Sequence, residues 1–314
     1  MKINNFFNKI VLSLSATLIF YFVILLFSDI RQIDLSNLDF KLEYYPLIIA
    51  ILFFHTLISN FRFYRLLHKL QIKISFVESL KIFMAGMSLG LTPGGIGVAI
   101  KCYILKNEFG KPITTTIPII FVERLTELIG ILAVLVTLNF FIFSYESIIV
   151  SIIGISFVVV FFMLISRKFI FSLLSSIFNK VTFFKKFIKS IDDSNDSFKQ
   201  LINKKTIFES GCYSIISKFL YLLAIYLIFL SFGIDLGIIS SGMIYYTSLL
   251  IGALSMIPSG IIITETSMLA MLLQHKVELS IATLLTITLR IISTWTLTIS
   301  GTIIYVIFYR RKNK

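Results

Sequence analysis

The chain has 314 residues, of which 57% are hydrophobic and 14% are charged, and its mean hydropathy is +0.94. A soluble fold of this length cannot bury so much apolar surface, so the composition predicts that lipid surrounds most of these side chains. The net charge of +13 is also found in nucleic-acid-binding proteins, but an excess of Lys and Arg is typical of loops that flank membrane helices. We therefore expect an all-α polytopic membrane protein without a nucleic-acid partner.

Continuous apolar runs predict about six full membrane spans, because a spanning helix needs about 20 apolar residues. The strands of a membrane barrel would instead alternate apolar and polar residues. The first run follows Lys2 and Lys9, as in a signal peptide, but its length and the poor cleavage site at Ser28-Asp29 predict a retained helix. The predicted spans are residues 10–27, 44–61, 113–138, 148–165, 213–232 and 281–308.

Two further apolar segments are broken by Pro and Gly, with the sequences LTPGGIG at residues 91–97 and MIPSG at residues 256–260. A charged residue follows each proline after 7 or 8 residues, and an arginine follows it after 31 or 32. Paired breaks in the two halves of a membrane protein indicate a binding site at the repeat interface. The matched positions are Pro93 with Lys101 and Arg124, and Pro258 with Glu265 and Arg290.

The distribution of Lys and Arg predicts the topology. Residues 62–81 hold five, residues 167–205 hold nine and the tail 310–314 holds four, whereas the intervening loops are mostly acidic. By the positive-inside rule both termini face the cytoplasm, and the expected location is the inner or cytoplasmic membrane. Both broken segments must then form hairpins that return to the side on which they start.

The first hairpin is predicted to have arms at residues 76–91 and 98–105, and the second at 236–257 and 261–274. Eight residues of helix reach only about 12 Å, less than half of the hydrocarbon core, so the first hairpin is expected to be re-entrant. The arm 236–257 is long enough to span the bilayer, which leaves the depth of the second hairpin open.

Two spans, a hairpin and a further span then occur twice, with opposite orientation. We therefore expect one transmembrane domain, residues 1–314, built as an inverted-topology repeat with halves at 1–143 and 144–314. The basic and Phe-rich segment 166–210 is either an interfacial helix on an anionic leaflet or an ordinary cytoplasmic loop.

Charged groups inside lipid are costly and usually functional. Arg124 and Arg290 lie about 14–17 Å into their predicted spans, near the midplane, and a guanidinium suits phosphate or carboxylate. Half-helix N-termini after the breaks would present free N–H groups to an anion. The candidate substrate-binding residues are Thr92, Pro93, Gly94, Gly95, Gly97, Lys101, Glu123, Arg124, Glu127, Pro258, Ser259, Gly260, Glu265 and Arg290.

Structural interpretations of the same residues remain open. Arg124 and Glu127 are spaced to neutralise each other on one helix. Lys101 and Glu265 are placed to form one buried ion pair across the pseudo-twofold axis. The Pro and Gly residues also suit kinks and close helix packing. Lys218 lies only about 10 Å into its predicted span, so it is expected to reach the interface and receives no role.

No enzyme motif is present, and the scattered cysteines and histidines give no metal-ligand spacing, so no catalytic residue, metal or cofactor is expected.

With these motifs the chain resembles the family of the lysylphosphatidylglycerol synthase transmembrane region, also called the flippase-like domain family. The resemblance covers residues 10–308. It rests on residues 92–97 with Lys101, on Glu123-Arg124 followed by Leu125 and Glu127, and on Pro258-x-Gly260 with Glu265 and Arg290.

The resemblance implies a membrane domain associated with moving aminoacylated or polyprenyl-phosphate lipids between leaflets. Longer relatives add a cytosolic aminoacyl-transferase domain, and because this chain ends six residues after Phe308 we expect no enzyme activity. An acidic residue commonly follows the first glycines in the family. Val98 and Ala99 stand there in this chain, which argues against proton coupling at the first hairpin.

The leading hypothesis is a lipid flippase-like transporter, whose partners are the bilayer and a phospholipid or lipid-linked anionic substrate bound by Lys101, Arg124 and Arg290. One alternative is an ion-coupled transporter of a small anion that uses the same site. The other is a non-transporting scaffold for a lipid-modifying enzyme or a glycosyltransferase. The sequence names neither the lipid nor the oligomeric state.

Overall fold

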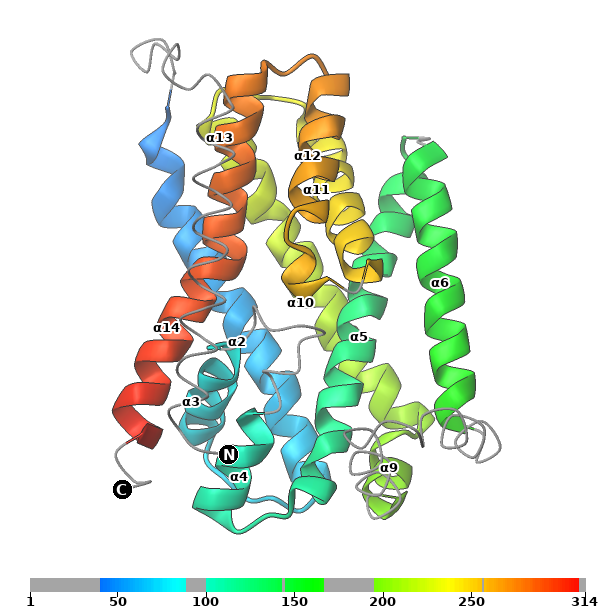
Figure 1. The fold of residues 1–314 in the computed structure, drawn as a ribbon, viewed down its shortest axis with the longest axis vertical. Coiled ribbons are helices and arrows are strands. Elements are labelled where there is room, and N and C mark those ends of the chain that lie inside the picture. The colour runs from blue at the N-terminus through cyan, green and yellow to red at the C-terminus, as the bar shows by residue number, and fades with distance from the viewer. Residues whose placement is uncertain (1–39, 89–99, 143–144, 167–194, 256, 311–314) are drawn as a thin grey trace.

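The computed structural model describes residues 40–88, 100–142, 145–166, 195–255 and 257–310, and every regular element within these ranges is helical. The predicted first span, the first Pro-Gly break and most of the basic segment 166–210 lie outside the described residues. The helices form an elongated bundle whose axes run mainly along its length (Figure 1). This arrangement confirms the all-helical fold class.

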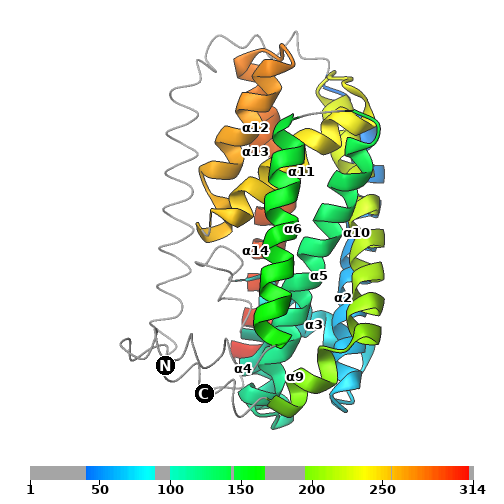
Figure 2. The same ribbon diagram turned by 90° about the vertical axis from the view of Figure 1, so that its right-hand side faces the viewer.

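The long helices occur where the apolar runs predict them. They are α2 (Tyr45–Lys69), preceded by the short turn η3 (Leu42–Tyr44), α5 (Ile113–Asn139), α6 (Tyr145–Ser166) and α10 (Lys204–Ser231). Figure 2 shows α2 and α10 side by side along one edge of the bundle, with α6 on the face toward the viewer. Length and composition would let four described helical stretches cross a membrane: Leu42–Lys69, Lys204–Ser231, Gly237–Leu254 and Leu279–Tyr309.

Two of these helices extend beyond the predicted spans, and the extensions change which charged residues belong to a helix. α10 begins at Lys204 rather than at residue 213, because the Asn203 side chain caps it by accepting from the Thr206 amide at 2.8 Å. α2 continues to Lys69, so Arg62 belongs to a helix and is buried, and its assignment to a cytoplasmic loop was wrong. A short helix, α9 (Asn195–Leu201), precedes α10.

Each Pro-Gly break is flanked by a helical pair, and the two pairs lie at opposite ends of the bundle (Figure 1). The first pair is α3 (Phe76–Met87), which starts with a capping box between Ser75 and Glu78, and α4 (Ile100–Phe109). The second pair is α11 (Gly237–Leu254) and α12 (Ile263–Gln274), joined through η5 (Pro258–Gly260) near mid-height.

The turn between α11 and α12 has an unusual backbone. Ser259, Gly260 and Ile262 have φ values of 53°, 64° and 75°. Positive φ costs little at glycine but is a clear outlier for a β-branched residue such as Ile262. The returning chain also packs closely, since an added Cβ on Gly260 would lie 2.9 Å from the Cα of Gly252. The break is therefore a tight and strained reversal of the chain.

The last span is one helical rod with two changes of winding. α13 (Leu279–Arg290) passes through a π turn, η6 (Ile291–Trp295), into α14 (Thr296–Tyr305) and a second π turn, η7 (Val306–Arg310). α13 packs against α12 and α10, whereas α14 packs against α3. The rod thus joins the second helical pair at one end of the bundle to the first pair at the other (Figure 1).

Two apolar cores surround these contacts. The larger core gathers residues of α2, α5, α10, α11 and α13, and the smaller one lies around α3, α4 and the adjoining ends of α2 and α5. α10 is central to the larger core, because it packs against α2, α5, α11 and α13.

Gly301 provides a test of the contact between α14 and α3. A Cβ at this position would overlap the Met84 carbonyl oxygen and lie 2.8 Å from the Ser88 nitrogen, both of them backbone atoms that cannot rotate away. We expect Gly301→Ala to lower the free energy of unfolding by about 1–3 kcal/mol. Thermal unfolding in detergent measures this. Gly211→Ala in α10 is the matched control, because an added Cβ there meets nothing within 4 Å. Equal stability of the two variants would contradict the contact.

Candidate functional site

Lys101 of α4 forms a buried ion pair with Glu123 of α5. Its ammonium donates to both carboxylate oxygens at 3.1 Å, and only 1% of Lys101 is exposed. The same ammonium lies 4.7 Å from the ring centre of Phe63 and 4.4 Å from that of Phe83, within cation–π range. A Cβ at Gly86 would lie 2.5 Å from the Lys101 Cγ, so the glycine makes room for the lysine stem.

Glu265 of α12 forms the second buried pair, with Arg290 at the end of α13. The Arg290 Nε donates to a Glu265 carboxylate oxygen at 2.7 Å, and its Nη2 donates to the Ser259 carbonyl at 2.9 Å. Neither charged side chain is more than 3% exposed. The guanidinium therefore holds both the first turn of α12 and the strained turn before it.

The two pairs occupy corresponding places in the two halves, with opposite polarity. In each, the charge that follows the Pro-Gly break meets a charge on the next long helix, but Lys101 and Glu123 have the reverse signs of Glu265 and Arg290. The proposed ion pair between Lys101 and Glu265 is therefore wrong. Each has a partner on the helix that follows it and packs against it, α5 for α4 and α13 for α12.

A third charged cluster surrounds Glu127 of α5. Arg124 donates to this carboxylate at 2.9 Å, so the spacing of three residues does form the expected pair. Arg62 of α2 donates to the other carboxylate oxygen at 3.4 Å, and it also bonds to Thr126 and Ser214. The Arg124 side chain is 47% exposed, whereas that of Arg62 is 3% exposed. The cluster thus joins α2, α5 and α10.

Lys218 of α10 belongs to this cluster, although no role was predicted for it. It interacts electrostatically with Glu127, Arg62 and Arg124, and its stem packs where a Cβ on Gly130 of α5 would stand. Because α10 begins at Lys204, Lys218 lies about 21 Å along the helix rather than near its end. The sequence did contain a pattern that indicates this cluster, because both α2 and α10 carry polar residues at helical spacing along one face. On α2 these are His55, Ser59 and Arg62, and on α10 they are Ser210, Ser214, Ser217 and Lys218.

The remaining predicted site residues divide into two groups. Pro258, Ser259 and Gly260 form the turn before α12, where Arg290 contacts the Ser259 carbonyl. No group of three or more His, Cys, Asp or Glu that would hold a metal ion occurs in the described part of the chain. The first break lies outside the described residues and comprises Thr92, Pro93, Gly94, Gly95 and Gly97.

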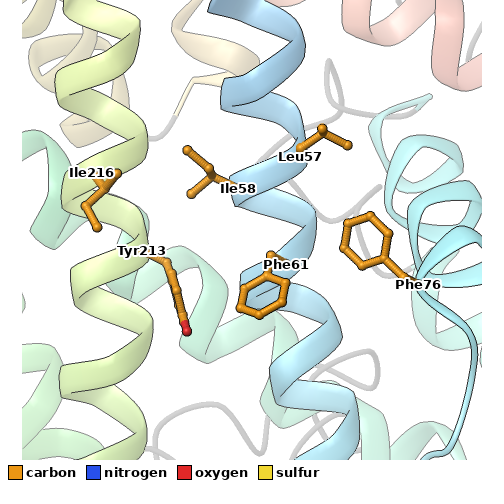
Figure 3. Close-up of a pocket in the computed structure, with 6 residues that line it drawn as sticks. All are labelled: Leu57, Ile58, Phe61, Phe76, Tyr213 and Ile216. Carbon is orange, nitrogen blue, oxygen red and sulfur yellow. The ribbon is translucent and has the colours of Figure 1, made fainter.

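An apolar groove of about 350 Å³ lies between α2 and α10, close to α3 (Figure 3). None of its lining residues is charged. The lining residues are Leu57, Ile58, Phe61, Phe76, Tyr213 and Ile216.

Comparison with known proteins decides the family. The model of the lysylphosphatidylglycerol synthase TM region matches residues 9–301 of this chain. The chain belongs to that family. No curated protein and no solved structure was found to match. This member of the family is a membrane protein, and its matched region contains all three charged clusters.

The pairing within each half predicts a specific pattern of double mutants. Lys101→Met strands a buried carboxylate, so we expect the free energy of unfolding to fall by about 3–5 kcal/mol. Adding Glu123→Gln removes that charge and should restore most of the loss. Adding Glu265→Gln instead should destabilise further, because that residue belongs to another pair. Thermal unfolding in detergent distinguishes these cases, and rescue by Glu265→Gln alone would refute the pairing.

Proposed function

We propose that this protein binds a phospholipid or a lipid-linked phosphate, aminoacylated or polyprenyl, and moves it between the leaflets of the cytoplasmic membrane. The single observation that carries the proposal is the presence of two buried ion pairs of reversed polarity, each beside a Pro-Gly break. Buried pairs add little stability compared with apolar packing, and ionisable groups inside a membrane are usually functional. Membership of the lysylphosphatidylglycerol synthase TM family supports a lipid as substrate.

The ion pairs offer a way for a substrate to act on the hairpins. An entering phosphate competes with Glu265 for the guanidinium of Arg290, which also holds the Ser259 carbonyl. Losing that contact loosens the turn in which Ile262 has a φ of 75°. Backbone strain of this kind is typical of switch regions. The second hairpin would then move when the headgroup binds, while the acyl chains stay in the bilayer.

We further infer that the two halves, 1–143 and 144–314, form an inverted-topology repeat in one transmembrane domain with both termini cytoplasmic. The placement of the α3–α4 and α11–α12 pairs at opposite ends of the bundle supports this (Figure 1). So does the basic character of residues 106–111. Hairpins that enter from opposite faces would give the substrate access from each leaflet in turn.

Single cysteines introduced on a background without Cys102 and Cys212 test the repeat. We expect a cysteine in the loop 110–112, between α4 and α5, to react with a membrane-impermeant reagent only from the cytoplasmic side. A cysteine in the loop 275–278 should react only from the outside. Labelling both loops from the same side would reject the inverted repeat.

Transport is tested with a variant that removes the second pair without stranding a charge. Glu265→Gln with Arg290→Met should fold, yet we expect the rate of lipid movement in liposomes to fall at least about tenfold, which corresponds to 1.4 kcal/mol of lost stabilisation. Arg65→Met is the control, since Arg65 pairs with Glu209 at the end of α2 and lies outside the proposed path.

Quenching of a fluorescent phospholipid by an impermeant reductant gives the rate. Wild-type movement by the double variant would leave the pair with a structural role. If the wild-type protein itself moves no lipid, uptake of a small anion or a scaffolding role for a partner enzyme becomes the better hypothesis.

A further inference from the structure

The charges around Glu127 do not cancel, which sets this cluster apart from the two ion pairs. Arg62, Arg124 and Lys218 contribute three positive charges and Glu127 contributes one negative charge, so a surplus of two positive charges remains. The nearby pair of Lys101 and Glu123 adds no net charge.

Lys218 accounts for much of this imbalance. No carboxylate of the described residues lies within 4.0 Å of its ammonium. Glu127 interacts with it electrostatically, but that carboxylate already accepts from Arg62 and Arg124. An uncompensated charge at this depth in a bilayer is costly. The described part of the chain thus supplies no second carboxylate that pairs with this cluster.

The three cations also have the geometry of a shared site. They lie on three helices that pack against one another, α2, α5 and α10. The helices α2 and α10 run in opposite directions (Figure 1), and Lys218 on α10 interacts electrostatically with Arg62 on α2. The Arg124 side chain is 47% exposed and that of Arg62 is 3% exposed, so an anion would reach the cluster past Arg124.

We propose that Arg62, Arg124 and Lys218 form a binding site for a phosphate group inside the membrane, carried by a lipid headgroup or present as a free ion. One or two negative charges would offset the surplus. The planar guanidiniums and the compact ammonium are the groups that proteins use for phosphate. Glu127 orients the two arginines by accepting one hydrogen bond from each. The inference rests on the proposed function for its lipid ligand, and its test measures binding without transport.

Lys218→Met separates a binding role from a structural one, because the two roles predict opposite changes in stability. Removing a cation that has no ionic partner among the described residues should raise the melting temperature of the ligand-free protein in neutral detergent. The same change should weaken the binding of phosphatidylglycerol at least tenfold, measured by lipid-dependent thermal stabilisation and by native mass spectrometry. If Lys218 only supported Glu127, the variant would melt at a lower temperature and bind the lipid as the wild type does.

Three controls complete the experiment. Arg65→Met on the same helix as Arg62 should leave binding unchanged, since Arg65 lies outside the cluster. Phosphatidylcholine tests whether net negative charge is needed, and inorganic phosphate at constant ionic strength tests a free ion. Arg124→Gln provides a second variant should Lys218→Met fail to fold, because its side chain is already 47% exposed.

The outcomes are distinct. Stabilisation by phosphatidylglycerol that both variants lose supports a headgroup site, and stabilisation by inorganic phosphate alone supports a site for a free anion. Wild-type binding by either folded variant, or no stabilisation by any phosphate compound, would overturn the inference. Phosphatidylglycerol binding at this cluster by a protein that moves no lipid would reject the proposed function and leave the site intact.

Discussion

An ionised side chain inside a bilayer must be neutralised by a group that it can reach without the help of water. In the described part of this protein, the groups that neutralise each other connect neighbouring helices. Lys101 and Glu123 join α4 to α5, Glu265 and Arg290 join α12 to α13, and the groups around Glu127 join α2, α5 and α10. Except for Arg124 and Glu127, which are both on α5, the partners lie on different helices, so these ion contacts also fix how two helices pack.

Small residues make these contacts possible. Gly86 leaves space for the stem of Lys101, and Gly130 leaves space for that of Lys218. Gly252 lets Thr264 and the turn at Gly260 approach α11. Association of helices in lipid depends on such close approach, since the hydrophobic effect gives little preference between lipid and protein. The glycines and the charges therefore act together, and a larger residue at one of these positions would separate a charge from its partner.

Much of the fold was predictable from the sequence, because apolar run length and helix-breaking residues are local properties. The helices flanking both breaks end within a few residues of their expected positions. The choice of ionic partners was not predictable in the same way. It depends on which helices pack side by side, and that made the pair of Lys101 with Glu265 look as reasonable as the pairs that form.

Assigning charged residues to loops from the ends of the apolar runs led to errors at two positions. The rule treats an arginine at the end of an apolar run as part of a cytoplasmic loop, and so it assigned Arg62 to a loop although this residue is buried within α2. Lys218 was dismissed for a related reason, since the apolar run was taken to start at residue 213 and not at the capped end of α10. Polar residues that continue a helical stripe were the better guide in both cases.

The π turn at Ile291–Trp295 has a consequence for the last span as a whole. A π turn closes its hydrogen bonds over one residue more than an α turn, so it offsets the residues that follow around the helix axis. α13 can therefore direct Arg290 toward α12 while α14, in the same rod, directs Gly301 toward α3. If the same residues were wound as a continuous α-helix, the two faces would rotate out of register, and the rod would match one neighbour only. The π turn therefore allows one helical rod to pack against both α12 and α3, which contact it on different faces.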